Sequence, residues 1–518
     1  MVLAAAGASL VAAQAGAQTV LSDYESADQA QKVRDNALWR LAFRPTLQVL
    51  DQTIATLQHG AKLSAEDNAA IAALTQKARS LPEPEARRTY WEAVSRVLGR
   101  RWDATQEMVG ALSVKVAHPV ISESATTLDL ATLYPVTPAA SARFSIVLFK
   151  GVATSSATPQ RGENVRELAS GTIGAKLPRT VPVSFAGVPD GFYLLLTRVT
   201  APDGASSEIA TPFYIVHDLG RRQAALERKL QRVTGHDAAR QTALYPFALA
   251  SALNAGTREV ISYDFNAAIA RSEAIVSDLL AGKDSVKQAK GLQSRAYRFA
   301  ETGELIPYQI FVPSAWTPDR KWPLVVALHG ANLDETNMLG RAGGRMQQLA
   351  EQRGVIVVAP LGYRINSAYG SQRGMGRLLG IEDTRLRRSE ADVLAVTDLV
   401  TAEYSVDPER VYLTGNSMGG GGTWWIGGQH PERWAAIAPA AFGGVIPEDV
   451  PGLSRLPILA VVGDKDELGM LDRVKSAVSI LRQGGVRPGY LEVAGGTHSS
   501  AFDTALPRIL DFFESHRK

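Results

Sequence analysis

The hydrophobic positions of this chain follow different periods in different regions, and the changes of period divide the sequence. From residue 18 to 116, apolar residues recur every three to four positions, which predicts helices. Ser64 is expected to cap one of them, with Ile71 and Leu74 on its inner face. From 117 to 218 the apolar runs become short and rich in β-forming residues, with turn residues between them: 144–149, 181–185, 192–196 and 213–216. This pattern of short strand-like runs separated by turns predicts a small β-sandwich of immunoglobulin (Ig) type.

The rest of the chain predicts a helical linker and then a mostly parallel sheet. Residues 219–291 return to helical spacing, and from 292 to 518 apolar runs alternate with helical stretches. The first two runs, 297–299 and 308–312, are expected to form an antiparallel pair. The later runs are almost continuously apolar: 324–328, 355–358, 411–413, 435–437, 458–462 and 490–493. Such strands belong to a sheet flanked by helices on both faces, so the predicted fold class is α/β, preceded by a helical region and an Ig-like sandwich.

One serine stands where a strand is predicted to turn into a helix. Ser417 is the centre of Gly-Asn-Ser-Met-Gly, which follows the apolar run 411–413 and leads into a predicted helix start. This context makes the pattern a nucleophile elbow, a turn so tight that its flanking positions require glycine. The pattern alone is weak in a chain with 45 glycines, and its place after a strand is what gives it meaning.

Further reactive side chains follow other strands of the predicted sheet. The carboxyl ends of parallel strands lie along one edge of a sheet, so groups that follow them are expected to meet. Asp464 and Asp466 follow one strand and His498 follows the next, which gives the order Ser, acid, His of α/β-hydrolases. His498 is expected to take the proton of Ser417, while one of the two aspartates orients the histidine.

Two backbone N–H groups are predicted to stabilise the oxyanion that forms when the serine attacks a carbonyl carbon. Met418 directly follows the nucleophile, and Ala331 lies in the loop after the His329-Gly330 turn. His329 is a second candidate base. Because it directly follows a strand and precedes a glycine, its expected role is to shape the oxyanion loop.

The stretches 406–420, 422–424 and 431–439 resemble a known family. They are similar to α/β-hydrolase esterases of the feruloyl esterase and polyhydroxybutyrate depolymerase group, whose catalytic domain is related to that of prolyl oligopeptidases. The resemblance covers residues 292–518. It implies a serine hydrolase that cleaves carboxylic esters of aromatic (feruloyl) or polyester type. It also implies that Asp466, in Gly-Asp-Lys-Asp, is the acid and that Ala331 supplies the second oxyanion donor.

Two other functions compete with ester hydrolysis. A prolyl-oligopeptidase-like peptidase would cover its site with a propeller of repeated blades, and the sequence before residue 292 shows no repeat. A binding protein with a vestigial hydrolase domain is the other alternative. The presence of Ser417, His498 and an acid argues against that reading.

Substrate specificity is predicted to lie in the glycine-rich and basic segment 361–388. A lid here would hold an aromatic or acidic acyl group, with Tyr369, Arg373 and Arg377 as substrate-binding residues. The alternative is a solvated loop that leads into a charged helix.

Composition limits the partners and the chemistry. The 518 residues suggest several domains, and a formal net charge of +3 gives no reason to expect nucleic acid or a membrane as a partner. The absence of cysteine excludes disulfides, thiolate metal sites and a cysteine nucleophile. No HExxH pattern occurs, so no metal and no cofactor is expected, and the partner is a small-molecule or polymer ester. Composition leaves the oligomeric state open.

The first 17 residues are small and apolar and end in Ala15-Gly16-Ala17. They resemble the apolar core and cleavage site of a secretory signal, although the positively charged front part is missing. A periplasmic or secreted protein is therefore the expectation, and an N-terminal tail is the alternative.

Overall fold

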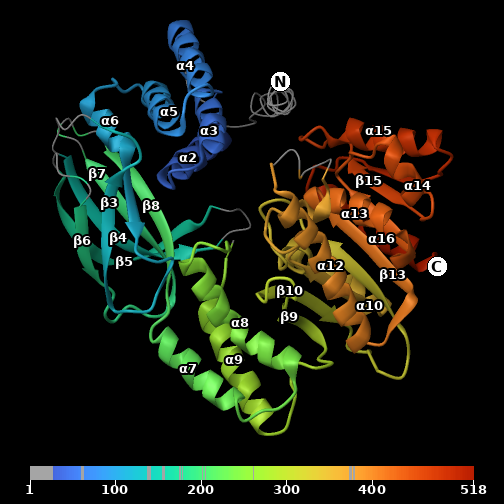
Figure 1. The fold of residues 1–518 in the computed structure, drawn as a ribbon. Helices are drawn as coiled ribbons and strands as arrows, with labels where there is room; N and C mark the ends of the chain where they lie inside the picture. Colours follow the sequence, from blue (N-terminus) through green and yellow to red (C-terminus); the bar gives the residue numbers. More distant parts are fainter. Residues whose placement is uncertain are drawn as a thin grey trace. The chain divides into compact units, whose positions relative to one another are not determined.

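A computed structural model of the chain describes residues 27–518, except 60–62, 137–141, 154–157, 174–176, 178, 201, 203, 205, 261, 373–375 and 377–379. The described residues form two units (Figure 1). The N-terminal unit extends to Arg221 and also takes in Ser262–Asn266, and the C-terminal unit comprises the rest. The signal-like segment predicted for residues 1–17 lies outside the described residues.

An eight-stranded mixed sheet forms the centre of the C-terminal unit. Its strands lie in the order β16, β15, β14, β13, β11, β12, β10 and β9. Only β10 runs against its neighbours β9 and β12, and the other described pairs are parallel. The strands are β9 (Gly291–Arg298), β10 (Leu305–Val312), β11 (Trp322–Leu328), β12 (Ile356–Pro360), β13 (Val406–Asn416), β14 (Ala436–Ala440), β15 (Leu459–Gly463) and β16 (Gly489–Val493). The predicted α/β class and the antiparallel pair are confirmed.

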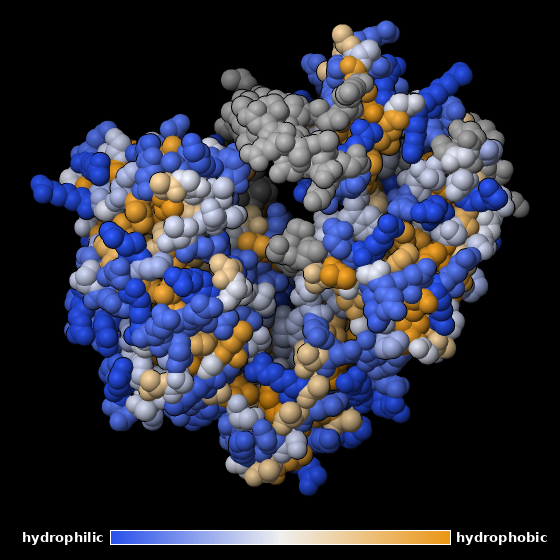
Figure 2. Space-filling model, turned by 180° about the vertical axis from the view of Figure 1, so that it is seen from behind, coloured by the Kyte–Doolittle hydropathy of each residue, from blue (hydrophilic) through white to orange (hydrophobic). Residues whose placement is uncertain are grey.

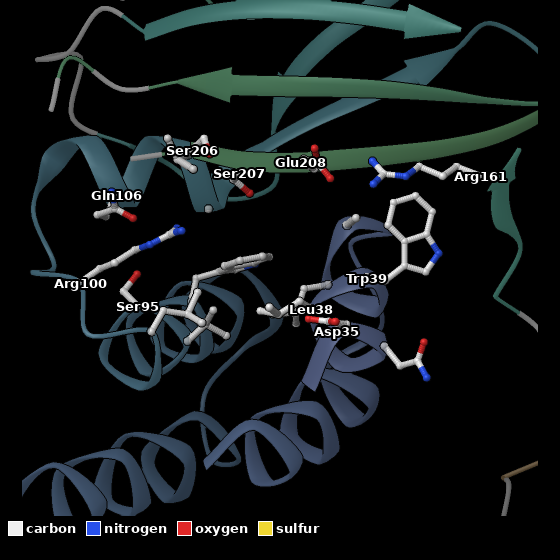
Figure 3. Close-up of a pocket in the computed structure, with 18 of the residues that line it drawn as sticks. Asp35, Leu38, Trp39, Ser95, Arg100, Gln106, Arg161, Ser206, Ser207 and Glu208 are labelled. Atoms are coloured by element: carbon white, nitrogen blue, oxygen red, sulfur yellow. The ribbon is translucent and has the colours of Figure 1, made fainter. Parts of the chain in front are cut away.

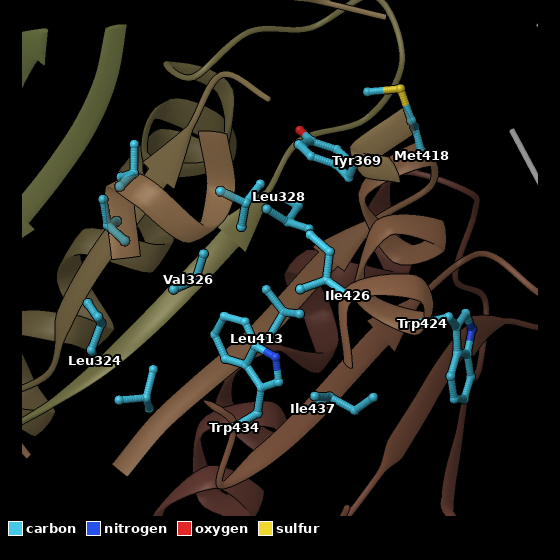
Figure 4. Packing of buried hydrophobic residues seen from close by; sticks show 14 of the residues in the cluster. Leu324, Val326, Leu328, Tyr369, Leu413, Met418, Trp424, Ile426, Trp434 and Ile437 are labelled. Atoms are coloured by element: carbon cyan, nitrogen blue, oxygen red, sulfur yellow. The ribbon is translucent and has the colours of Figure 1, made fainter. Parts of the chain in front are cut away.

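Helices cover both faces of this sheet. One hydrophobic core includes side chains of α12 (Asp383–Glu403), α13 (Met418–Gln429) and α15 (Met470–Gln483). Figure 4 shows Trp424 and Ile426 of α13 within this core. The core on the other face includes α10 (Asn337–Arg353) and α16 (Ser500–Glu514). Along β11, Leu324, Val326 and Leu328 belong to the first core, and Val325 and Ala327 belong to the second. Both sides of the strand are buried, which explains why its sequence is apolar throughout.

Shorter elements and a group of helices complete the C-terminal unit. The connections contain α14 (Val450–Leu453) and the 3₁₀ turns η1 (Ala368–Gly370), η2 (Pro431–Arg433) and η3 (Pro447–Asp449). Ahead of the sheet lie α7 (Leu219–Leu230), α8 (Asp237–Asn254) and α9 (Phe265–Leu280), in the region where helices are predicted. α8 packs against β9 and β10 at one edge of the sheet.

The N-terminal unit begins with a cluster of helices that has its own core. The helices are α2 (Ala27–Ala42), α3 (Leu47–His59), α4 (Ala65–Ala78), α5 (Glu83–Val97) and α6 (Ala104–Ala111). The predicted cap is confirmed, since the Ser64 side chain accepts a hydrogen bond from the N–H of Asp67 at the start of α4. Ile71 is buried in this core and Leu74 packs against it.

Two antiparallel sheets follow the helices and share one core. Their strand orders are β1-β3-β6 and β2-β8-β7-β4-β5, with β2 and β8 as a parallel pair. The strands are β1 (Leu112–Val116), β2 (Val120–Ile121), β3 (Ala125–Thr132), β4 (Ala142–Val152), β5 (Gln160–Ile173), β6 (Arg179–Ser184), β7 (Gly191–Thr200) and β8 (Ser206–Ile215). The predicted strand runs fall in β4, β6, β7 and β8. β1 corrects the expected helical region, whose helices end at Ala111.

The strands that the sequence pattern misses are the polar or exposed ones. β5 has exposed or half-buried side chains along almost its whole length, and β3 buries only Leu128 and Leu130 fully. Such strands carry little hydrophobic period, because most of their side chains face water.

Hydrophilic residues cover most of the visible face of the molecule, with hydrophobic residues in smaller groups between them (Figure 2). Within the described ranges, no helix is both long and apolar enough to cross a membrane.

Candidate active site

Ser417 occupies the sharp turn between β13 and α13. Its backbone has φ 58° and ψ −120°, a conformation that non-glycine residues rarely adopt and that surrounding contacts must hold in place. The two glycines of the motif allow this turn. A Cβ on Gly415 would lie 2.4 Å from the carbonyl oxygen of Gly419, and one on Gly419 would lie 2.1 Å from that of Leu328. The N–H of Ser417 donates to Ala440 O on β14 at 3.0 Å, which anchors the turn to the sheet.

The structure brings Ser417, His498 and Asp466 into one hydrogen-bonded chain. His498 Nε2 lies 2.8 Å from Ser417 Oγ, and His498 Nδ1 lies 2.9 Å from Asp466 Oδ2. The Asp466 side chain is 0% exposed and that of His498 is 10% exposed, so both are largely shielded from water. With the ring proton on Nδ1, His498 donates to the carboxylate and accepts the serine proton at Nε2.

The two candidate aspartates have different partners. Asp466 also accepts N–H groups through Oδ1, from Leu468 at 3.0 Å and Met470 at 3.4 Å, so the loop fixes its carboxylate. Asp464 Oδ1 instead accepts the N–H of Gly495 at 2.7 Å and ties the two loops together. Asp466 is therefore the aspartate that contacts the histidine.

Glu467 is a site residue that the sequence analysis does not single out. Its Oε2 accepts the backbone N–H of His498 at 2.9 Å, so adjacent acidic residues hold the backbone and the ring of the same histidine. Its place directly after Asp466, in the loop at the end of β15, is the feature that could have identified it.

The loop after β11 lies against Ser417. A Cβ on Gly330 would be 3.6 Å from Ser417 Cβ, which places the next residue, Ala331, beside the serine. The backbone N–H groups of Ala331 and Met418 have no hydrogen-bond partner among the described residues. Two donors next to the serine are thus available to an oxygen atom of a ligand.

A pair of asparagines fastens this loop to the one after β12. The N–H of Asn332 donates to Asn366 Oδ1 at 2.8 Å, and Asn366 Nδ2 donates to Asn332 Oδ1 at 2.9 Å. Asn332 has φ 60°, so the clasp holds a residue in a sparsely populated conformation directly after Ala331. Both asparagines follow ends of adjacent strands, a position that could have marked them in the sequence.

His329 lies behind the site and is fully buried. Its Nδ1 is 2.9 Å from Gly330 O and its Nε2 is 2.9 Å from Leu361 O. Burial lowers the pKa of this histidine. Because both ring nitrogens face backbone carbonyls, the ring braces the loops after β11 and β12 and does not contact Ser417.

The segment after β12 corrects part of the predicted lid. Tyr369 is only 1% exposed, and its hydroxyl donates to His329 O at 3.2 Å, so it is a core residue that supports the site rather than a residue open to substrate. Arg364 pairs with Glu304 at 2.7 Å. Arg373 and Arg377, the other predicted substrate-binding residues, lie outside the described residues.

Asp392 of α12 holds the start of the segment that follows β12. Its carboxylate is fully buried and accepts the Tyr297 hydroxyl at 2.5 Å and the Tyr363 N–H at 2.8 Å. Burial raises the pKa of Asp392 to about 6, although these hydrogen bonds act in the opposite direction.

In the part of the chain that the structure describes, no cluster of His, Asp or Glu could hold a metal ion.

Comparison with known proteins supports the resemblance deduced from the motifs. Residues 300–510 match a family model described as "Putative esterase". This part of the chain is esterase-like. A poly(3-hydroxybutyrate) depolymerase of Ralstonia pickettii is 30% identical over 138 residues, which is 25% of this chain and 25% of that protein. A bifunctional acetylxylan esterase/xylanase of Neocallimastix patriciarum is 29% identical over 163 residues, or 31% of this chain and 21% of that protein.

These matches confirm the predicted resemblance to the esterase group that includes polyhydroxybutyrate depolymerases. The chain spans less than half the length of the curated relatives it matches. Among solved structures, a thermostable esterase covers 78% of this chain and 100% of its own, with 17% identity and a TM-score of 0.37. A ferulic acid esterase of Anaeromyces mucronatus covers 43% of this chain and 90% of its own, with 18% identity and a TM-score of 0.34.

Proposed function

We propose that the C-terminal unit hydrolyses carboxylic esters through a covalent acyl-enzyme on Ser417. The observation that carries the proposal is the chain of contacts from Ser417 Oγ to His498 (2.8 Å) and from His498 to Asp466 (2.9 Å). A serine hydroxyl is a weak nucleophile at neutral pH and needs a base within hydrogen-bond reach. The sequence match to esterases supports an ester rather than another acyl compound as the substrate.

Acylation follows from the direction of these hydrogen bonds. Ser417 Oγ attacks the ester carbonyl carbon as His498 Nε2 takes its proton, and the buried Asp466 carboxylate stabilises the imidazolium. The carbonyl oxygen becomes an oxyanion, which accepts hydrogen bonds from the N–H groups of Ala331 and Met418. When the C–O bond breaks, His498 returns the proton to the leaving alcohol. Ser417 then carries the acyl group.

Deacylation reverses these roles with water. His498 takes a proton from a water molecule, whose oxygen attacks the acyl carbon, and the same two N–H groups hold the second oxyanion. The bond to Ser417 Oγ then breaks, the serine regains its proton from His498, and the free acid leaves. The steps balance without a metal or a redox partner.

The names of the relatives suggest esters of polymers as substrates. One relative is named as an esterase of acetylated xylan and another as a depolymerase of a polyester. We extend the proposal to aromatic or hydroxyalkanoate esters at the surface of a polymer. Arg373 and Arg377 are the proposed contacts to an acidic acyl group, because arginine pairs with carboxylates in a two-pronged geometry.

The experiment compares purified wild type with Ser417→Ala on p-nitrophenyl acetate, methyl ferulate, hydroxybutyrate oligomers and a proline peptide. Hydrolysis of at least one ester by wild type, lost in the variant, is expected. Equal rates for both proteins, or no turnover of any ester, would refute the proposal. Cleavage of the peptide alone would favour the peptidase alternative.

The N-terminal unit and the destination of the protein complete the proposal. The strand orders A-B-E and A′-G-F-C-C′ of Ig sandwiches correspond to β1-β3-β6 and β2-β8-β7-β4-β5, which supports an Ig-like module.

The small apolar residues that end at Ala17 support export and a mature chain that starts at Gln18. The mass of the protein recovered from the periplasm or medium tests this, and an uncut chain kept in the cytoplasm would contradict it.

A further inference from the structure

A pocket of about 490 Å³ lies within the N-terminal unit, far along the chain from the hydrolase motifs. Its walls come from α2, α5 and α6 on one side and from β5 and β8 on the other (Figure 3). This volume falls within the range of small-molecule pockets, about 300 to 1,000 Å³. The labelled residues that line it are Asp35, Leu38, Trp39, Ser95, Arg100, Gln106, Arg161, Ser206, Ser207 and Glu208.

Polar side chains at one end of this pocket lack partners. Ser95 is 5% exposed and Gln106 is 4% exposed, yet the Ser95 hydroxyl and the Gln106 amide make no hydrogen bond to any described residue. The guanidinium of Arg100 likewise has no partner within the described ranges. The indole Nε1 of Trp91, another lining residue, is buried without an acceptor. The polar atoms of Ser95, Arg100 and Gln106 are not fully buried and line the pocket, so this end can hydrogen-bond a molecule rich in donors and acceptors.

A half-buried tryptophan stands at the other end. The Trp39 indole Nε1 donates to Pro159 O at 2.9 Å, and the ring meets Phe43 edge to face at 5.3 Å, so its orientation is fixed. The Arg161 guanidinium lies 6.0 Å from the ring centroid. A fixed indole offers a flat apolar surface at little entropic cost to binding.

Charged groups of both signs line the pocket. Two carboxylates, Asp35 and Glu208, and two guanidinium groups, Arg100 and Arg161, contribute to its lining. Glu208 is already paired with Arg198, which lies outside the lining, at 2.7 Å. With Arg198 counted, the three guanidinium groups exceed the two carboxylates by one, so the pocket carries no large charge of either sign that would select a strongly charged ligand, and its charged groups hydrogen-bond well to hydroxyls.

We propose that this pocket binds a neutral oligosaccharide, with a sugar ring against Trp39 and hydroxyls hydrogen-bonded to Ser95, Arg100 and Gln106. Sugars combine an apolar face of C–H groups with many hydroxyls, the combination that this pocket complements. The inference concerns a second site, separate from the chemistry at Ser417, so it stands or falls independently of the proposed function.

Isothermal titration calorimetry of the full chain with xylotetraose, cellotetraose, mannotetraose and maltotetraose tests the proposal. At least one tetrasaccharide should bind at millimolar concentration or below. Arg100→Ala should weaken it about tenfold, because a charged hydrogen bond is lost. Arg101→Ala, an exposed neighbour outside the lining, is the matched control and should bind as wild type does.

A second variant guards against a folding artefact. Trp39→Ala should abolish binding while p-nitrophenyl acetate hydrolysis and the far-ultraviolet circular dichroism spectrum stay unchanged. Lack of binding of all four tetrasaccharides to wild type overturns the proposal. Equal binding by wild type and Arg100→Ala overturns the assigned site, and tight binding of trigalacturonate or ferulate in place of the neutral sugars overturns the ligand class.

Discussion

Polar side chains around Ser417 and around the N-terminal pocket are arranged in opposite ways. Beside the serine, His498, Asp466 and Glu467 are joined by hydrogen bonds, and the N–H groups of Ala331 and Met418 have no partner among the described residues. Around the N-terminal pocket, Ser95, Arg100 and Gln106 have no partner among the described residues. A site that carries out a reaction must fix its groups in advance, whereas a binding pocket keeps its hydrogen-bonding capacity for the ligand.

The largest expected effect tests the reactive side of this comparison. Ser417→Ala should lower kcat for an ester substrate by about 10⁶-fold, because the covalent route is removed. Steady-state kinetics measure this loss. The control is Ser499→Ala, which changes an exposed serine directly after His498 and should leave kcat close to that of wild type. Saccharide binding should be the same in Ser417→Ala and wild type. A joint loss of both functions would show that the two sites are not separate.

The two aspartates of one loop give the next largest difference. Asp466→Asn should lower kcat by about 10⁴-fold, because an amide cannot stabilise the imidazolium and disturbs the histidine tautomer. Asp464→Asn removes only a hydrogen bond to Gly495 and should change kcat less than about tenfold. Similar losses in both variants, at unchanged circular dichroism, would contradict the assignment of Asp466.

Buried Asp392 should make stability depend on pH. Its folded-state pKa is raised by burial from 3.8 to about 6, so the folded chain binds this proton more tightly than the unfolded chain does. That stabilisation is complete below about pH 4 and is lost as the pH rises through about 6. Between pH 4 and 7, wild type should therefore lose on the order of 2 kcal/mol of unfolding free energy relative to Asp392→Asn.

Urea unfolding at several pH values measures this difference. Asp383→Asn changes an exposed carboxylate of the same helix, so it should follow the wild-type pH profile. A constant difference between wild type and Asp392→Asn across this range would mean that Asp392 does not titrate there.

The asparagine clasp predicts a smaller effect on catalysis. Asn366→Ala releases Asn332 and loosens the loop that carries the Ala331 N–H, so kcat should fall about tenfold to a hundredfold with little change in KM. Asn366→Asp keeps an acceptor for the Asn332 N–H and should recover part of the rate. A rise in KM with unchanged kcat would instead indicate a direct contact with substrate.

The smallest expected effect sharpens the contrast between the two regions. Arg100→Ala removes a side chain without a protein partner in the described structure, so the unfolding free energy should change by less than about 0.5 kcal/mol. Thermal unfolding of wild type, Arg100→Ala and Arg101→Ala should give nearly the same midpoint. A clear loss in Arg100→Ala alone would show that this guanidinium stabilises the fold and is not reserved for a ligand.

Prediction from the sequence succeeds best where one period dominates. The run 324–328 identifies a strand because both faces of the sheet are buried and every position is apolar. β5 and β3 escape detection, since exposed strands do not need apolar side chains. Tyr369 was expected to bind substrate because of its polar, basic neighbours. Its side chain is nevertheless part of the core, since it packs against α13, where a Cβ on Gly422 would lie 2.7 Å from the ring carbon Cδ2.

By itself, the sequence determines the chemistry available at the reactive site. The motif around Ser417 can be recognised from its place between a predicted strand and a predicted helix. The order of Ser, Asp and His can be recognised because each residue follows a predicted strand. Only the tertiary structure decides that His498, 81 residues from Ser417, reaches it, and that Asp466 rather than Asp464 completes the contact. It also decides that Trp39 and Glu208 line one pocket. Contacts between residues that are distant in the sequence depend on how helices and strands pack against one another, and a local sequence pattern does not predict that packing.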